Sequence, residues 1–397
     1  MLKTTHLSST PSVNRLIKIW ASRYVPDLSP LYEVSDRTSA YTALALAASP
    51  TGRALTADRL SGFFINIRCK MAAIKSYGLY TSNANKFDLK EAYQLSSYAL
   101  IVYEKLLEIY QQPSFCATSV HGMPIAAAAA INSLHGPLGS WGMPPITELA
   151  KTLEPVLLEF QQQHISAQNW RTLGFITTLL NFSNELIPKK LTLPEQVLIQ
   201  PYFQFVEEQV ALPWERVCAA AANHSLGSPA LTLVEQLLPQ SPDIAVAVYQ
   251  RLQELLPNHR SRRGKLTDPG ITHSCLRDLE MFQAYLWLCL LEGSLAPIQY
   301  ELVDLCVMVM TGVKVKWEMT ELWNKVLAEE ILARVTPDQA LIVLPYTEGL
   351  QQAFLKQKER FQLKPNDLYL PDELQERFNS RGPRSFYFPK SRISVVE

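Results

Sequence analysis

The chain has 397 residues, of which 47% are hydrophobic and 19% charged, and its 37 basic residues equal its 37 acidic residues in number. This content is enough for a large core and excludes a globally disordered protein. The neutral balance excludes overall attraction to nucleic acid or membrane surfaces, so a polyanion would have to bind locally.

The beginning of the chain, MLKTTHLSSTPSVNRLIKIW, has no long apolar core of the kind that signal peptides carry. The two most apolar runs, 284–291 and 305–313, are shorter than the ~18–20 residues needed to cross a bilayer. We therefore expect a soluble protein without membrane insertion.

Helical periodicity dominates the sequence. In DLKEAYQLSSYALIVYEKLLEIYQQ (88–112), apolar residues recur every three or four positions and form one stripe on a long helix. Asp88 is a typical N-cap, Glu91 completes a capping box, and Pro113 ends the segment. This segment is the clearest predicted element of the chain.

Further helices are expected wherever the same spacing is closed by proline or glycine. They lie near 56–77, 124–134, 146–163, 167–186, 193–211, 213–223, 229–238, 242–256, 274–292, 298–312, 316–333 and 346–361. Strand patterns are scarce, and only 15 glycines argue against a turn-rich β fold. The sequence predicts an all-α protein, either a multi-helical bundle or an irregular α-solenoid of helical hairpins with an extended C-terminal tail.

Two turn-rich stretches, 135–145 and 258–273, interrupt the helical pattern and suggest joints between lobes. The predicted units are an N-terminal helical lobe (1–140), a central lobe of helical hairpins (141–258), a C-terminal helical lobe (271–362) and a basic, aromatic tail (363–397).

A first candidate site surrounds the segment PIAAAAAINSL, whose small side chains permit close helix packing or leave room for an apolar ligand. A pocket here would involve His121, Met123, His135 and Trp141. The two histidines flank opposite ends of the predicted helix, roughly 20 Å apart at about 1.5 Å per residue, so they cannot share one metal ion. Close packing is the favoured interpretation.

A second candidate is the basic loop, in which Arg260, Arg262, Arg263 and Lys265 lie within six positions. Such groups could clamp phosphate, because arginine presents a planar fork to phosphate oxygens. No aromatic residue is interleaved to stack on bases. We favour a solvated joint between lobes over a dedicated anion-binding site.

A third candidate is the tail sequence SRGPRSFYFPKSRI. Arg384, Phe386, Tyr387, Phe388 and Arg392 combine aromatic anchors with cationic neighbours, as protein interfaces do. The same mixture could stack on bases and neutralise phosphates. Docking on the protein's own core or on a partner is the favoured interpretation because the net charge is neutral.

The cysteines have neither CxxC nor zinc-ribbon spacing, and most lie in apolar helical segments where buried free thiols are usual. They are Cys69, Cys116, Cys218, Cys275, Cys289 and Cys306. Free thiols favour a cytoplasmic location. No HExxH or Cys/His cluster indicates a metal, and no motif indicates a cofactor.

Neither GxSxG, a papain-like cysteine, a P-loop nor GxGxxG is present. The function expected from the sequence is a non-catalytic helical adaptor, scaffold or assembly factor with a protein partner. One alternative is a nucleic-acid-associated ribonucleoprotein subunit, binding RNA or DNA through the basic loop and the tail together. A second alternative is an all-α enzyme or cofactor-binding protein with its pocket near 121–141.

Overall fold

The structure, a computed structural model, describes residues 10–80, 89–112, 138–160, 170–261 and 263–362. These residues are almost entirely helical, which confirms the all-α class. The strands in the described part are β1 (Arg260–Ser261) and β2 (Gly264–Lys265), which pair antiparallel as a short hairpin. No helix within these ranges combines the length and apolar character needed to span a membrane.

The first helices are α1 (Pro11–Ala21), α2 (Ser29–Val34), α3 (Arg37–Ala48), α4 (Pro50–Leu60), α5 (Phe63–Tyr80) and α6 (Leu89–Tyr110). There follow η1 (Leu138–Trp141), α8 (Ile146–Phe160), α9 (Trp170–Leu186), η3 (Pro188–Lys190), α10 (Leu193–Ala211), α11 (Trp214–Ala220), η4 (Ala221–Asn223), α12 (Pro229–Leu237), η5 (Leu238–Gln240) and α13 (Ser241–Leu255). The last are α14 (Pro269–Glu292), the π-helical η6 (Ile298–Leu302), α15 (Val303–Val313), α16 (Trp317–Leu332) and α17 (Pro337–Gln362).

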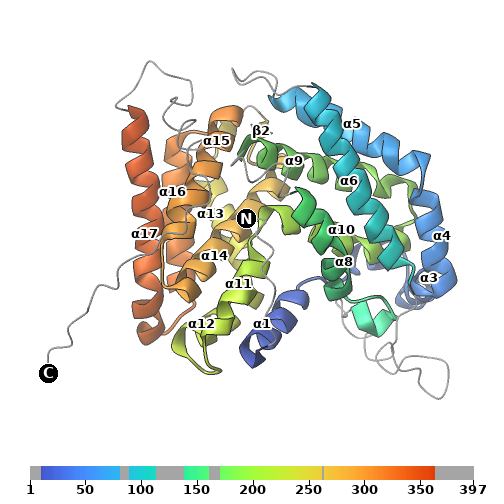
Figure 1. Cartoon of the computed structure of the whole chain (residues 1–397), viewed down its shortest axis with the longest axis horizontal. Helices are drawn as coiled ribbons and strands as arrows, with labels where there is room; N and C mark the ends of the chain where they lie inside the picture. Colours follow the sequence, from blue (N-terminus) through green and yellow to red (C-terminus); the bar gives the residue numbers. More distant parts are fainter. Residues whose placement is uncertain (1–9, 81–88, 113–137, 161–169, 262, 363–397) are drawn as a thin grey trace, which may run out of the picture.

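The helices form two flanking groups joined by a central one. Figure 1 shows α3 to α6 on one side and α13 to α17 on the other, with α9, α10 and α11 between them. The helix α1 lies beside α11 and α12 (Figure 1), and it packs against α11. Segments from the beginning and the middle of the chain are therefore neighbours in space.

Several helix boundaries differ from the periodic pattern, and local backbone chemistry explains why. The helix expected over 56–77 is two helices, because Gly62 takes φ +62°, a left-handed conformation that ends α4 and redirects the chain into α5. The last helix begins at Pro337, nine residues before the expected 346, since proline suits the first helical turn. Thr336 and Gln339 cap this start by exchanging backbone-to-side-chain hydrogen bonds.

Buried apolar side chains from Val13 to Phe354 pack as one hydrophobic cluster across the described ranges. Aromatic contacts connect distant segments within it: the ring centroids of Trp20 and Phe205 lie 5.9 Å apart, and those of Phe282 and Trp323 lie 5.6 Å apart. The division into three lobes and a tail stays a prediction. The central helices α10 and α14 matter most for the site, because both carry buried charged residues.

Candidate functional site

A cavity of about 170 Å³ lies where α9, α14, α15 and α16 meet the β1–β2 hairpin. Its wall is mainly apolar and rich in sulfur and aromatic groups. Six of these apolar lining residues are Met281, Phe282, Leu305, Met310, Met319 and Trp323. Thioethers and rings of this kind offer favourable contacts to a flat, polarizable guest.

Two ring nitrogens among the lining residues have no hydrogen-bond partner within the described part of the chain: His259 Nε2 and Trp323 Nε1. His259 is 9% exposed and Trp323 is 7% exposed, so bulk solvent does not account for them. Burial, together with the charge of Lys316, lowers the pKa of His259, which leaves a neutral imidazole at pH 7. Buried polar atoms are almost always paired in folded proteins, so these nitrogens need a partner.

The hairpin places one basic side chain at the cavity and turns others away. Arg260 pairs with Lys265 across the two strands, and both are exposed. Gly264 has φ +145°, and a Cβ there would lie 2.1 Å from the Asp268 carboxylate. That carboxylate accepts the Lys265 backbone N–H over 2.9 Å and fixes the turn. Arg263 lines the cavity, whereas Arg260 and Lys265 are exposed, and the anion-binding role of the loop stays a prediction.

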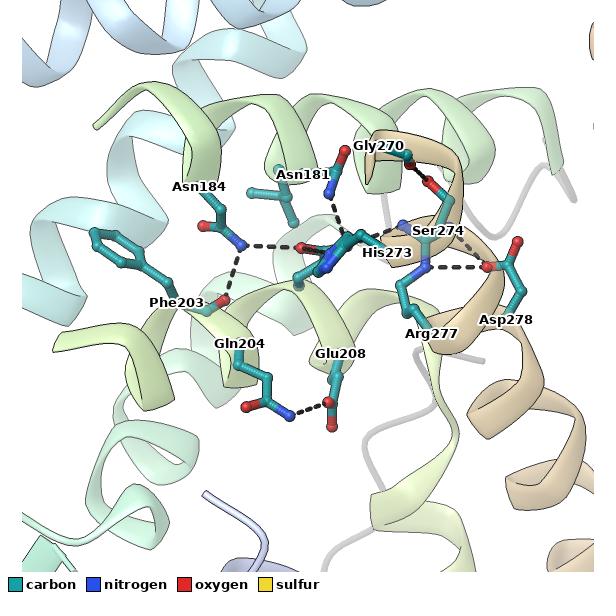
Figure 2. A network of polar contacts seen from close by, with 12 residues as sticks. Asn181, Asn184, Phe203, Gln204, Glu208, Gly270, His273, Ser274, Arg277 and Asp278 are labelled. Atoms are coloured by element: carbon teal, nitrogen blue, oxygen red, sulfur yellow. Dashed lines mark hydrogen bonds and ion pairs between the residues drawn. The ribbon is translucent and has the colours of Figure 1, made fainter. Parts of the chain in front are cut away.

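A buried ionic cluster on α10 and α14 adjoins the cavity (Figure 2). Arg277 Nη1 donates to Glu207 Oε1 over 2.9 Å, and His273 Nε2 lies 3.0 Å from the same oxygen. Asn184 Nδ2 donates to Glu207 Oε2 over 3.1 Å, while Arg277 Nε and Nη2 both donate to Asp278 Oδ1. Burial raises the pKa of Glu207, but His273 and Arg277 outweigh it and lower the pKa to about 2. Glu207 is thus a permanent buried anion.

The adjacent carboxylate, Glu208, belongs to a second buried cluster that joins the segment after α1 to α10 and α14. Tyr24 Oη donates to Glu208 Oε2 over 2.8 Å, and Gln204 Nε2 donates to Oε1 over 2.7 Å. Arg23 pairs with Glu280 and lies 3.6 Å from Glu208 Oε2. Burial raises the pKa of Glu208 to about 7. The negative charge of Glu280 adds to this upward shift, while Arg23 opposes it.

No family model, curated protein or solved structure matches this chain.

Most of the residues singled out from the sequence lie outside the described ranges. They are His121, Met123, His135, Arg262, Arg384, Phe386, Tyr387, Phe388 and Arg392. Trp141 is described: it is buried and packs on Tyr41 with ring centroids 5.5 Å apart. The pocket near 121–141 and the interface role of the tail stay predictions. So does the nucleic-acid alternative, which requires the loop and the tail on one face.

The buried clusters were not anticipated from the sequence, although one signal was present. Glu207 and Glu208 stand side by side in the apolar run PYFQFVEEQVALPW, and adjacent charges within such a run indicate paired buried groups. Among the described residues, no group of three or more His, Cys, Asp or Glu side chains could hold a metal ion. Burial raises the pKa of Cys275 to about 12, so this thiol at the cavity stays protonated.

Proposed function

We propose that this protein is a non-catalytic helical binding protein that holds a small, mainly apolar molecule in the cavity between α9, α14, α15 and α16. The observation that carries the proposal is the pair of unpartnered nitrogens, His259 Nε2 and Trp323 Nε1, in a cavity wall that is mainly apolar. A ligand oxygen would accept the indole N–H and relieve an unmet hydrogen bond that costs about 1–3 kcal/mol.

The volume supports a ligand with a single ring. An engineered cavity of about 150 Å³ lined by aliphatic and aromatic side chains takes up benzene. At about 170 Å³, the cavity of this protein suits one aromatic ring with a short polar side chain. The protonated thiol of Cys275 is a poor nucleophile, which favours binding over covalent catalysis.

Phenylacetamide, one ring with a neutral carbonyl acceptor, is expected to bind and to raise the melting temperature as its concentration rises. Val309→Phe places a ring in the cavity and should weaken this binding at least tenfold. Val246→Phe is the matched control, because Val246 is 42% exposed on α13 and does not line the cavity. Calorimetric titration measures the affinity of phenylacetamide for the native protein and for each of the two variants. Absence of binding at millimolar concentration, or equal binding by the two variants, contradicts the proposal.

A second candidate function is the adaptor, scaffold or assembly-factor role expected from the sequence. The observation favouring it is a set of exposed apolar side chains on α5 and α6. These two helices pack against each other. They are Phe63, Met71, Ile74, Tyr93 and Ile101, all at least 41% exposed. Contiguous exposed apolar patches are typical of protein interfaces.

The adaptor role predicts site-specific crosslinking to a protein partner. A benzophenone amino acid replacing Ile74 should give a discrete heavier product in cells, because this position would lie within the interface. The same replacement at Lys325, whose side chain is 67% exposed on α16, is the control and should give none. Electrophoresis of the irradiated products is the measurement, and identical patterns from both positions would rule out an interface at α5.

A further inference from the structure

Arg263 is held at the cavity by neighbours from three elements. Its Nη1 donates to Ser274 Oγ on α14 over 3.1 Å, and its backbone N–H donates to Ser261 Oγ over 3.2 Å. Its guanidinium carbon lies 6.0 Å from the centroid of the Phe182 ring on α9. The Ser274 hydroxyl itself donates to the Gly270 carbonyl, so this serine orients Arg263 and has no hydrogen left for a ligand.

The Arg263 guanidinium, like that of the buried Arg53, has no carboxylate partner among the described residues, whereas several other arginines have one. Each of the following arginines forms an ion pair with at least one carboxylate: Arg23, Arg59, Arg216, Arg251, Arg277 and Arg334. Arg263 forms none with any carboxylate in the described ranges, although it is only partly exposed. Four of its five side-chain N–H groups remain after the bond to Ser274.

Two carboxylates beside the cavity, those of Asp278 and Glu207, already have cationic partners. Asp278 Oδ1 accepts two hydrogen bonds from Arg277, and Glu207 accepts one from Arg277 and faces His273. The hydrogen bond to Glu207 raises the pKa of His273, which favours the protonated imidazole beside that carboxylate. Arg263 forms no ion pair with either of these carboxylates, and it lies in the wall of the mainly apolar cavity.

We propose that the ligand of this cavity is a single-ring aromatic carboxylic acid, whose carboxylate binds the guanidinium of Arg263 while its ring lies among the methionine and aromatic side chains of α14, α15 and α16. This inference rests on the proposed function and names the ligand class of the same site. Arginine presents a planar fork of donors that matches a carboxylate, and the bonds are stronger in surroundings of low polarity. A free amine of the same shape would meet the positive charge of Arg263 instead.

Three probes with the same ring and a different polar group test the contribution of the charge. Phenylacetate carries the carboxylate, phenylacetamide replaces it by a neutral amide, and phenethylamine carries a cation on a similar frame. Calorimetric titration at low salt should show phenylacetate binding about tenfold more tightly than phenylacetamide, which is the worth of one charge-assisted hydrogen bond. Phenethylamine should bind most weakly.

Substitutions in the β1–β2 hairpin test whether Arg263 causes the preference for phenylacetate over phenylacetamide. Arg263→Gln retains a donor for Ser274 but removes the charge, so the ratio of phenylacetate affinity to phenylacetamide affinity should fall from about tenfold to about one. Arg260→Gln makes the same change at an exposed hairpin position and should keep the preference. Arg263→Lys keeps the charge without the planar fork and should give an intermediate ratio.

The outcomes distinguish this inference from the function on which it rests. If phenylacetamide binds and phenylacetate binds no better, the carboxylate assignment is wrong and the binding function stands. If the preference survives Arg263→Gln, another group recognises the carboxylate and the inference is overturned. If none of the three probes binds the native protein, the proposed function fails and this inference fails with it.

Discussion

Arg277→Met is expected to lower the free energy of unfolding by about 3–5 kcal/mol, the usual cost of removing one partner from a buried ion pair. Arg277 is the only described guanidinium that contacts Glu207, whose side chain is 4% exposed. Without it, Glu207 keeps its negative charge in the core with only His273 and neutral amides around it. Asp278 loses two hydrogen bonds in the same change.

Urea denaturation at pH 7 measures this loss, and Arg251→Met provides the matched control. Arg251 also contacts two carboxylates, those of Glu329 and Glu330, but its side chain is 38% exposed. Exposed ion pairs contribute about 0–1 kcal/mol, so the control should change stability little. Equal losses in the two variants would contradict the view that burial makes the Glu207 cluster costly to break.

Glu208→Gln is expected to stabilise the protein, by about 2–3 kcal/mol at pH 8. Arg23 is shared between two carboxylates, and the substitution leaves it with Glu280 alone. The glutamine oxygen can still accept from Tyr24, and its amide can donate to Gln204 once that side chain rotates. The change therefore removes a poorly compensated buried charge while its hydrogen bonds remain satisfied.

The same variant should change how stability depends on pH. The pKa of Glu208 is about 7 in the folded state, above its ordinary value of 4.5. The folded protein therefore holds this proton where the unfolded chain has lost it, and stability falls as pH rises from about 4.5 to 7. Glu208→Gln should flatten that decline. Glu207, with its pKa lowered to about 2, acts oppositely and should still cost stability as pH falls below about 4.5.

Denaturation profiles from pH 3 to pH 8 compare the native protein with Glu208→Gln and Glu207→Gln. The two substitutions are chemically identical and adjacent, yet they should move stability at pH 8 in opposite directions. Destabilisation by both would show that Glu208 is fully compensated in the folded protein.

The fold class was predictable because it depends on local spacing. The apolar stripe predicted over 88–112 corresponds to α6, which spans Leu89–Tyr110. Residue 88 lies outside the described ranges. Helix ends were less predictable, because tertiary packing can outweigh a local break. Pro345 lies inside α17 and is exposed, while Val343 and Leu350 on either side of it are buried and hold the helix against the core.

The candidate site was not predictable from local patterns, because its parts come from distant segments. Leu79, Thr177, Arg263 and Trp323 all line one cavity, and no spacing rule relates them. The sequence did identify Arg263 as basic and turn-borne, but only the hairpin geometry separates it from Arg260 and Lys265. The sequence therefore predicted a charged loop, but only the structure shows which of its side chains faces the cavity.

The placement of Arg23 has a consequence for synthesis of the chain. Its partner Glu280 lies 257 residues later, and the hydrogen-bond partner of Tyr24 lies 184 residues later. At ribosomal rates of roughly 5–20 residues per second, about ten to fifty seconds separate the appearance of Arg23 and Glu280. Until α11 has been synthesised, the helix α1 cannot dock, because α11 is part of the surface against which it packs. The nascent N-terminus is thus exposed to chaperones and proteases until most of the protein has left the ribosome.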